Sequence, residues 1–266
     1  MSAPAGARGG GWAVVGVLWR RDLTLFLRER GRIAAAVAQP IFFWLLLGSG
    51  FGSGLRSAGV PYLEYFFPGM VLMVVLFAAI FSTITVIEDR QQGFLRAVLA
   101  APVPRTGVVL GKVLGSASLC FAQGLVVLLL APAAGLPVHP AGFAAACAAA
   151  FLLANGLAGL GVALAWVSSS TAGYHAVMNL LLLPLWFLSG ALFPPDGAPV
   201  WLAWVMRADP LSYGLQALRE SLYLPDAAPP GLATAAPATA WAVCAGFAVL
   251  GHVLAAAAAG RAARTA

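Results

Sequence analysis

Residues 65–87 read YFFPGMVLMVVLFAAIFSTITVI and contain no charged side chain. A helix of this length, rising about 1.5 Å per residue, crosses the roughly 30 Å hydrocarbon layer of a bilayer. Within lipid a helix satisfies its own backbone hydrogen bonds, which an irregular segment cannot do. This stretch therefore predicts a transmembrane helix.

The composition of the whole chain agrees with a membrane protein. Of its 266 residues, 61% are hydrophobic and only 9% are charged, whereas soluble domains carry roughly 25% charged residues. So few charges cannot cover a soluble globule of this length. Beside several spans, no room remains for a soluble catalytic domain of ~100 residues.

Other apolar runs in the chain are also long enough to span a bilayer. We expect an all-α membrane protein in which residues 1–266 form a single transmembrane domain. The expected spans are residues 33–52, 65–87, 109–134, 141–167, 173–193 and 236–259.

The distribution of basic residues predicts the orientation. With both termini in the cytoplasm, twelve of the fifteen Lys and Arg residues fall on the cytoplasmic side. Cytoplasmic loops carry an excess of Lys and Arg, so this orientation is favoured. The net charge of +6 is explained by this bias, and we expect no nucleic-acid partner.

Residues 12–30 predict an amphipathic helix before the first expected span. An apolar stripe at steps of three and four residues contains Trp12, Val15, Trp19, Leu23 and Phe26. Arg21 and Arg28 project from the opposite side. Such a helix lies in the cytoplasmic interface and contacts membrane lipids, although the arginines could instead serve only as topology anchors.

Chemistry for catalysis or ion coupling is not evident. Every acidic residue lies in a loop or at the edge of a span, whereas coupled carriers place carboxylates within the membrane. The three histidines are scattered, and residues 107–113 lack the spacing and hydroxyl of a phosphate loop. We expect no catalytic residue, no metal and no ATP site in this chain.

His175 and Asn179 are the polar pair that we consider for a substrate path. They are four residues apart within an expected span, so they share a helix face. Polar side chains there either hydrogen-bond between helices or line a path for substrate.

Four segments carry a resemblance to a known family. They are PGM at 68–70, EDRQQGFLRAVLAAPVPR at 88–105, LSGALFPP at 188–195 and DPLSYGLQALR at 209–219. In this order, they resemble the permease subunits of type-2 ABC transporters, bacterial exporters of drugs, lipids or polysaccharides. The resemblance covers essentially the whole chain.

The resemblance implies that residues 88–105 form a cytoplasmic coupling helix that docks on an ATPase. The segment starts acidic and stops at prolines, with Phe94, Leu95 and Leu99 as an apolar contact; the alternative is a solvated loop. The expected coupling residues are Glu88, Arg90, Gly93, Phe94, Leu95, Arg96, Leu99, Pro102 and Arg105.

The resemblance also implies two short helices, re-entrant or interfacial, at Trp201–Met206 and Leu211–Tyr223. The residues expected to matter there are Asp209, Pro210, Tyr213 and Arg219. Asp209 stands where the family usually has Asn. Both residues cap helices, so the substitution preserves a turn or cap.

The implied function is that of a multi-pass export permease in the bacterial plasma membrane. It would have no cofactor of its own, since ATP and Mg would be bound by two copies of a partner ATPase. A second permease, identical or similar, would complete the complex. The sequence also leaves open a membrane-embedded lipid enzyme, for which no catalytic cluster is found, and a non-transporting membrane anchor.

Overall fold

The computed structural model describes residues 7–28, 31, 38, 41–42, 44–46, 56–57, 60–192, 199–224 and 235–262. Two short strands, β1 (Arg56–Ser57) and β2 (Val60–Pro61), form an antiparallel pair. The other elements are helical: α1 (Ala7–Arg28), α3 (Tyr62–Thr83), α4 (Thr85–Gln91), α5 (Phe94–Ala100), α6 (Arg105–Leu128), the 3₁₀ helix η1 (Ala131–Ala134), α7 (Pro140–Val167), α8 (Thr171–Leu188), α9 (Val200–Ala208), α10 (Pro210–Tyr223) and α11 (Pro237–Ala262).

Five helical stretches in the described residues are long and apolar enough to cross a membrane. They are Tyr62–Gln91, Arg105–Leu128, Pro140–Val167, Thr171–Leu188 and Pro237–Arg261. The chain is therefore a predominantly helical, multi-pass membrane protein. The expected span at 33–52 lies mostly outside the described residues.

Several helices begin or end at residues other than the expected ones. The helical stretch expected at 65–87 runs on to Gln91, with one turn residue, Ile84, between α3 and α4. α6 begins directly after Pro104, whose extended backbone precedes the first turn, and ends at Leu128 rather than 134. α8 ends at Leu188, because the chain turns at Gly190 with a φ of 84°.

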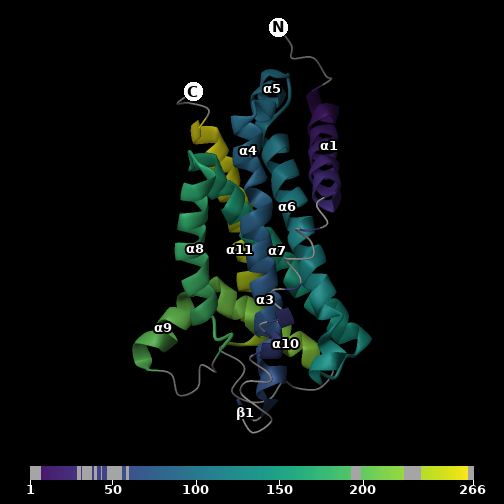
Figure 1. Cartoon of the computed structure of the whole chain (residues 1–266), viewed down its shortest axis with the longest axis vertical. Helices are drawn as coiled ribbons and strands as arrows, with labels where there is room; N and C mark the ends of the chain where they lie inside the picture. Colours follow the sequence, from purple (N-terminus) through teal and green to yellow (C-terminus); the bar gives the residue numbers. More distant parts are fainter. Residues whose placement is uncertain are drawn as a thin grey trace.

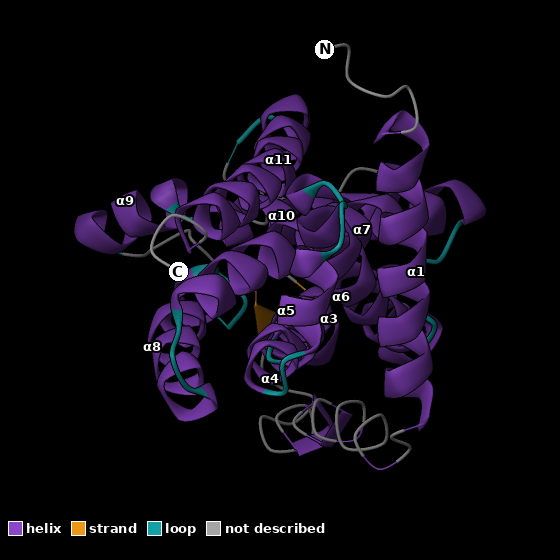
Figure 2. Ribbon diagram, turned by 90° about the horizontal axis from the view of Figure 1, so that it is seen from above, coloured by secondary structure: helices purple, strands orange, loops and turns teal. Residues whose placement is uncertain are grey.

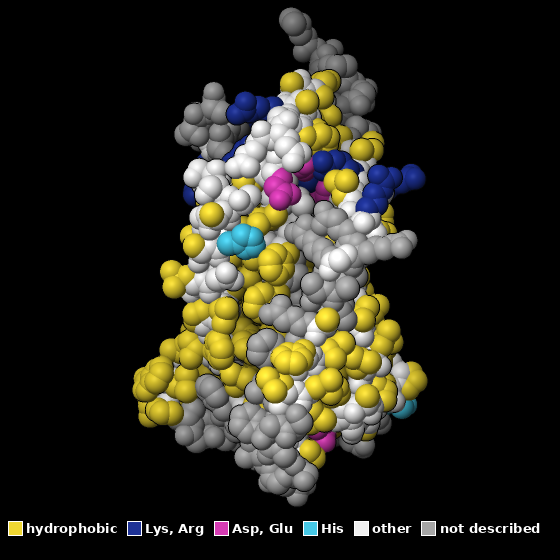
Figure 3. Space-filling model, viewed as in Figure 1, with side chains coloured by type: hydrophobic (Ala, Val, Ile, Leu, Met, Phe, Trp, Pro, Cys, Tyr) yellow, Lys and Arg dark blue, Asp and Glu magenta, His cyan; other side chains and the backbone are white. Residues whose placement is uncertain are grey.

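The helices form an elongated bundle in which the two ends differ (Figures 1 and 2). α5, the amino end of α1 and the carboxyl end of α11 lie at one end, which we call the α5 end. α9, α10 and the strands lie towards the other. Figure 3 shows charged side chains gathered near the α5 end and hydrophobic ones over the middle and the opposite end.

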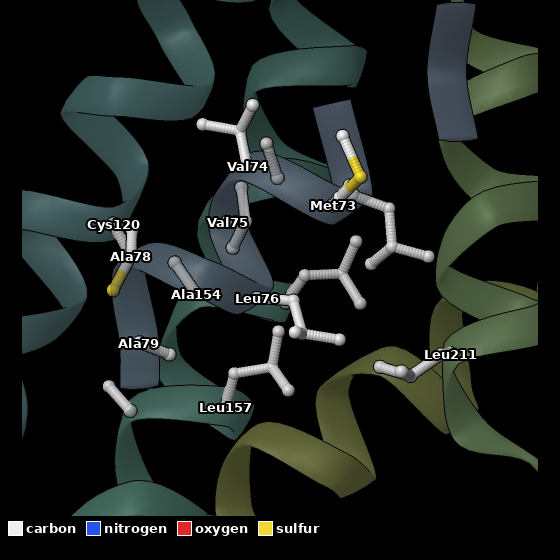
Figure 4. Packing of buried hydrophobic residues seen from close by; sticks show 14 of the residues in the cluster. Met73, Val74, Val75, Leu76, Ala78, Ala79, Cys120, Ala154, Leu157 and Leu211 are labelled. Atoms are coloured by element: carbon white, nitrogen blue, oxygen red, sulfur yellow. The ribbon is translucent and has the colours of Figure 1, made fainter. Parts of the chain in front are cut away.

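The core of the bundle is built around α3. In the most apolar window of α3 and α4, 83% of residues are buried, compared with 22% in α8. A helix that is apolar on all sides needs apolar surroundings on all sides. Side chains of α6, α7 and α10 surround α3. Figure 4 illustrates this with Val75 of α3 and with Cys120, Leu157 and Leu211 of the other three helices. α8 instead presents apolar side chains, such as that of Leu180, to the outside.

Candidate functional site

The candidate coupling segment is a helix–turn–helix at the α5 end. α4 ends at Gln91, the chain reverses at Gly93, and α5 runs from Phe94 to Ala100. Gly93 has a φ of 82°, a left-handed backbone conformation that residues other than glycine rarely adopt. Its position next to α5 makes a sharp reversal possible. The prolines at 102 and 104 follow α5, and α6 starts at Arg105.

The expected coupling residues differ in what they offer to a partner. Arg96, Pro102 and Arg105 are exposed; Glu88, Arg90, Gly93, Phe94 and Leu99 are half-buried. Leu95 is only 1% exposed and packs in the core. The expectation that Leu95 provides a contact surface was therefore wrong, because its side of α5 faces the bundle.

Four ionic side chains join three helices beneath this segment. The Lys112 ammonium on α6 is fully buried and donates to both carboxylate oxygens of Asp22 on α1, at 2.9 and 3.0 Å. It also contacts the carboxylate of Asp89 on α4. Arg21 donates two hydrogen bonds to Asp89, at 2.9 and 2.6 Å. We call Arg21, Asp22, Asp89 and Lys112 the ionic cluster.

The ionic cluster is connected directly to α5. The Arg21 guanidinium lies 3.9 Å from the centroid of the Phe94 ring, within the range of a cation–π contact. The half-buried Phe94 side chain is therefore held against α1. Through Arg21, the first residue of α5 is tied to α1, α4 and α6.

The electrostatics of the cluster balance internally. Burial raises the pKa of Asp22, and the Lys112 ammonium beside it acts in the opposite direction. With two carboxylates and two cations ionised, the net charge of the cluster is zero. Buried charges are costly unless they are paired and hydrogen-bonded, and all four meet that condition.

Sequence reasoning missed the cluster. Asp22 and Asp89 read as residues of loop or span edges, and Lys112 counted only as a cytoplasmic charge. A signal was nevertheless present: Lys112 directly follows Gly111 in a helix with apolar neighbours on both sides. A charge in such a place needs a partner from another helix.

α1 packs lengthwise along α6, and this contact positions Arg21 and Asp22. Gly107, Gly111 and Gly115 of α6 face Gly11, Val15 and Asp22 of α1 in the same order along both helices. A Cβ at position 111 would lie 3.0 Å from the Leu18 Cβ. Small residues at this spacing allow close helix approach.

The buried face of α1 differs from the expected stripe. Val15 and Leu18 are buried against the bundle, but Trp12 is 73% and Trp19 40% exposed. Phe26 is half-buried and Arg28 is exposed. The face of α1 towards α6 is formed by Gly11, Val15, Leu18 and Asp22, so of the expected stripe only Val15 belongs to it. The lipid contact expected for the exposed Trp12 and Trp19 stays a prediction. Trp19 also donates to the Ser118 hydroxyl at 3.0 Å.

Arg90 joins α4 to the end of α7. Its guanidinium donates to the Trp166 carbonyl at 2.7 Å and to the Ser168 carbonyl. These carbonyls belong to the last turn of α7 and its C-cap, where backbone acceptors lack helical partners. The Arg90 guanidinium therefore already has hydrogen-bond acceptors within this chain.

At the opposite end, Asp209 and Pro210 start α10. The Asp209 carboxylate accepts a hydrogen bond from the Leu211 N–H at 2.9 Å, so the expected helix cap is confirmed. Pro210 occupies the first helical turn, where no backbone donor is needed. Tyr213 donates to the Arg207 carbonyl at 2.8 Å.

Arg219 is buried and connects α10 to α8 and α3. It donates to the Gly190 carbonyl at 2.9 Å, and the Tyr65 hydroxyl donates to the same carbonyl at 2.7 Å. The guanidinium also lies 4.3 Å from the Tyr65 ring centroid. This arrangement holds the end of α8 in place.

His175 and Asn179 lie on α8. The His175 ring is half-buried, 5.6 Å from the Phe81 ring, whereas Asn179 is exposed. The described residues contain no group of three or more His, Cys, Asp or Glu side chains that could hold a metal ion.

The fold and the site define a polytopic helical membrane protein with a helix–turn–helix at one end, locked to its neighbours by buried charges. A family model described as ABC-2 type transporter matches residues 13–223, more than half of the chain. The chain belongs to the ABC-2 type transporter family of membrane transport permeases. The resemblance stated from the motifs is thereby confirmed.

Relatives agree with this assignment. The chain is 28% identical to a putative transport permease, ycf38, of Cyanophora paradoxa over 76% of this chain and 72% of the relative. It is 26% identical to nodulation protein J of Rhizobium leguminosarum bv. viciae, over 82% of this chain and 84% of the relative. It is 21% identical to the daunorubicin resistance ABC transporter permease protein DrrB1 of Streptomyces coeruleorubidus, over 77% of this chain and 73% of the relative.

Proposed function

We propose that the chain is the membrane subunit of an ATP-binding cassette exporter. In this proposal it moves substrate outward across a bacterial plasma membrane, using ATP hydrolysed by a separate ATPase subunit that binds the ATP and Mg. Membership of the permease family supports the proposal, and one relative is named as a drug-resistance ABC permease. The working complex contains two ATPases and a second permease, identical or similar.

The observation that carries the proposal is the connection of α5 to the bundle. Its outer face presents Arg96 and Ala97, while its inner face packs through Leu95 and Phe94. Arg21 of α1 contacts Phe94 of α5, and Lys112 of α6 contacts Asp89 of the preceding helix, α4. A push on the exposed face is transmitted to two long helices, as coupling to an ATPase requires.

The topology belongs to the same proposal. We place the α5 end in the cytoplasm, with both termini, and add the segment at 33–52 as a sixth span. Twelve of the fifteen basic residues then lie inside. α1 lies at the cytoplasmic interface, where its exposed Trp12 side chain contacts lipid. α9 and α10 form the re-entrant or interfacial segment at the outer side.

The test reverses a charge on the exposed face of α5. Arg96→Glu should reduce co-purification of the ATPase and export by at least tenfold while leaving permease abundance unchanged, because Arg96 has no role in the core. Arg261→Glu is the matched control: it also reverses an exposed arginine near the α5 end, but on α11. Normal recruitment and export in Arg96→Glu would contradict docking at α5.

A further inference from the structure

A cavity opens beside the ionic cluster, between α1, α6 and the junction of α3 with α4. Its volume is about 250 Å³, which accommodates the headgroup of an amphiphile rather than a whole drug-sized molecule. Its charged lining comes from Arg21, Asp22, Glu88 and Asp89, and Ser82 and Ser116 are among the polar residues beside them. None of the coupling steps proposed above uses this space.

The charges around the cavity do not cancel. Both cations of the ionic cluster, Arg21 and Lys112, are already paired with Asp22 and Asp89. Glu88 contributes another carboxylate, for which the described residues provide no hydrogen-bonding or ionic partner. The cavity therefore has a net charge of about −1 when all its carboxylates are ionised. A cationic ligand is favoured over an anionic one.

The rest of the lining selects a carbon-bearing cation over a bare metal ion. Leu25, Phe26 and Leu119 line the cavity together with the polar groups. An aromatic ring such as that of Phe26 attracts organic ammonium groups through its face. Leu25 is 43% exposed, so an apolar chain leaving the cavity would meet an apolar surface.

We propose that this cavity binds the ammonium headgroup of an amphiphile, with Glu88 as its counter-ion and Leu25 and Phe26 against the adjoining carbon chain. The headgroup can come from an ethanolamine lipid or from a cationic amphiphilic solute. The hydroxyls of Ser82, Thr85 and Ser116 are available as additional acceptors for ammonium N–H groups.

The test measures binding to the purified permease in neutral detergent, without the ATPase. The probes are a dodecylamine with a dansyl group at the end of its chain and the corresponding alcohol. The amine should bind at least tenfold more tightly than the alcohol. Glu88→Gln should remove this preference while leaving alcohol binding unchanged. Glu220→Gln, an isosteric change of a half-buried acid on α10, should keep it.

The two sources of ammonium are separated by competition. Ethanolamine lipid added to the micelles displaces the probe if lipid is the ligand, whereas a lack of displacement assigns the site to a cationic solute. Equal binding of amine and alcohol, or an unchanged preference in Glu88→Gln, would overturn the proposal. Because no ATPase is present, that result would leave the proposed export function untouched.

Discussion

Lys112 is the fully buried cation of the ionic cluster. Its side chain is fully buried between the carboxylates of Asp22 and Asp89. Removing the cation leaves two carboxylates to share Arg21, which is itself only partly buried. Lys112 directly follows Gly111, one of the positions at which α6 closely approaches α1.

Lys112→Met should therefore destabilise the protein by about 3–5 kcal/mol, the usual cost of removing one partner of a buried ion pair. Adding Asp22→Asn should recover part of that loss, because Arg21 and Asp89 then remain as a balanced pair. Thermal unfolding of both variants and of Asp22→Asn alone provides the double-mutant cycle. Wild-type stability in Lys112→Met would show that the cluster does not hold α1 in place.

Residue roles were predictable from the sequence only where local chemistry determines them. The Asp209 cap follows from an Asp–Pro pair at a helix start, a feature of adjacent residues. The burial of Leu95 and the contacts of Arg90 were not predictable, because they depend on which side of α4 and α5 faces the bundle. That choice is made by Arg21 and by the end of α7, which are far away in the sequence.

At the scale of elements, the contact between α1 and α6 determines whether α1 moves with the bundle. Glycines at 107, 111 and 115 let the helices approach, and every contact of Asp22 with Lys112 depends on that approach. The glycine spacing was visible in the sequence. Its partner was not, because the exposed tryptophans of α1 dominated the apparent apolar stripe.

Gly111→Leu should separate α1 from α6 and destabilise the protein by roughly 1–3 kcal/mol, the range for overpacking a close contact. The added side chain would begin 3.0 Å from Leu18 and 3.2 Å from the Val15 carbonyl. Gly16→Leu is the control, since its Cβ would meet no atom within 4 Å. Unfolding midpoints and protease cleavage within α1 report the difference; equal effects at both positions would refute this account.

At the scale of the whole molecule, the two ends differ in composition. The α5 end carries the ionic cluster, whereas α9 at the other end exposes Trp201 and Trp204. The helical spans were predictable from hydropathy because lipid requires long apolar helices. The ends were harder to predict, since they combine turns, caps and long-range ion pairs.

The proposed orientation predicts opposite labelling at the two ends. In a chain with its native cysteines replaced, Arg207→Cys on α9 should react with a membrane-impermeant maleimide in intact cells, and Ala97→Cys on α5 should not. Both positions are exposed in the structure. Inside-out vesicles should reverse the pattern. Labelling of position 97 from outside intact cells would invert the topology.

Arg90 and Arg219 share a property that affects how the chain tolerates sequence change. Each donates to main-chain oxygens, those of Trp166 and Ser168 or that of Gly190, near the beginning and the end of α8. A carbonyl remains whatever side chain its residue carries, so the two anchor points of α8 impose little demand on the residue types that accept the bonds. The constraint falls on the two donors. The helix between them can therefore diverge in sequence, adapting its outward face to different surroundings while its ends keep the same attachments.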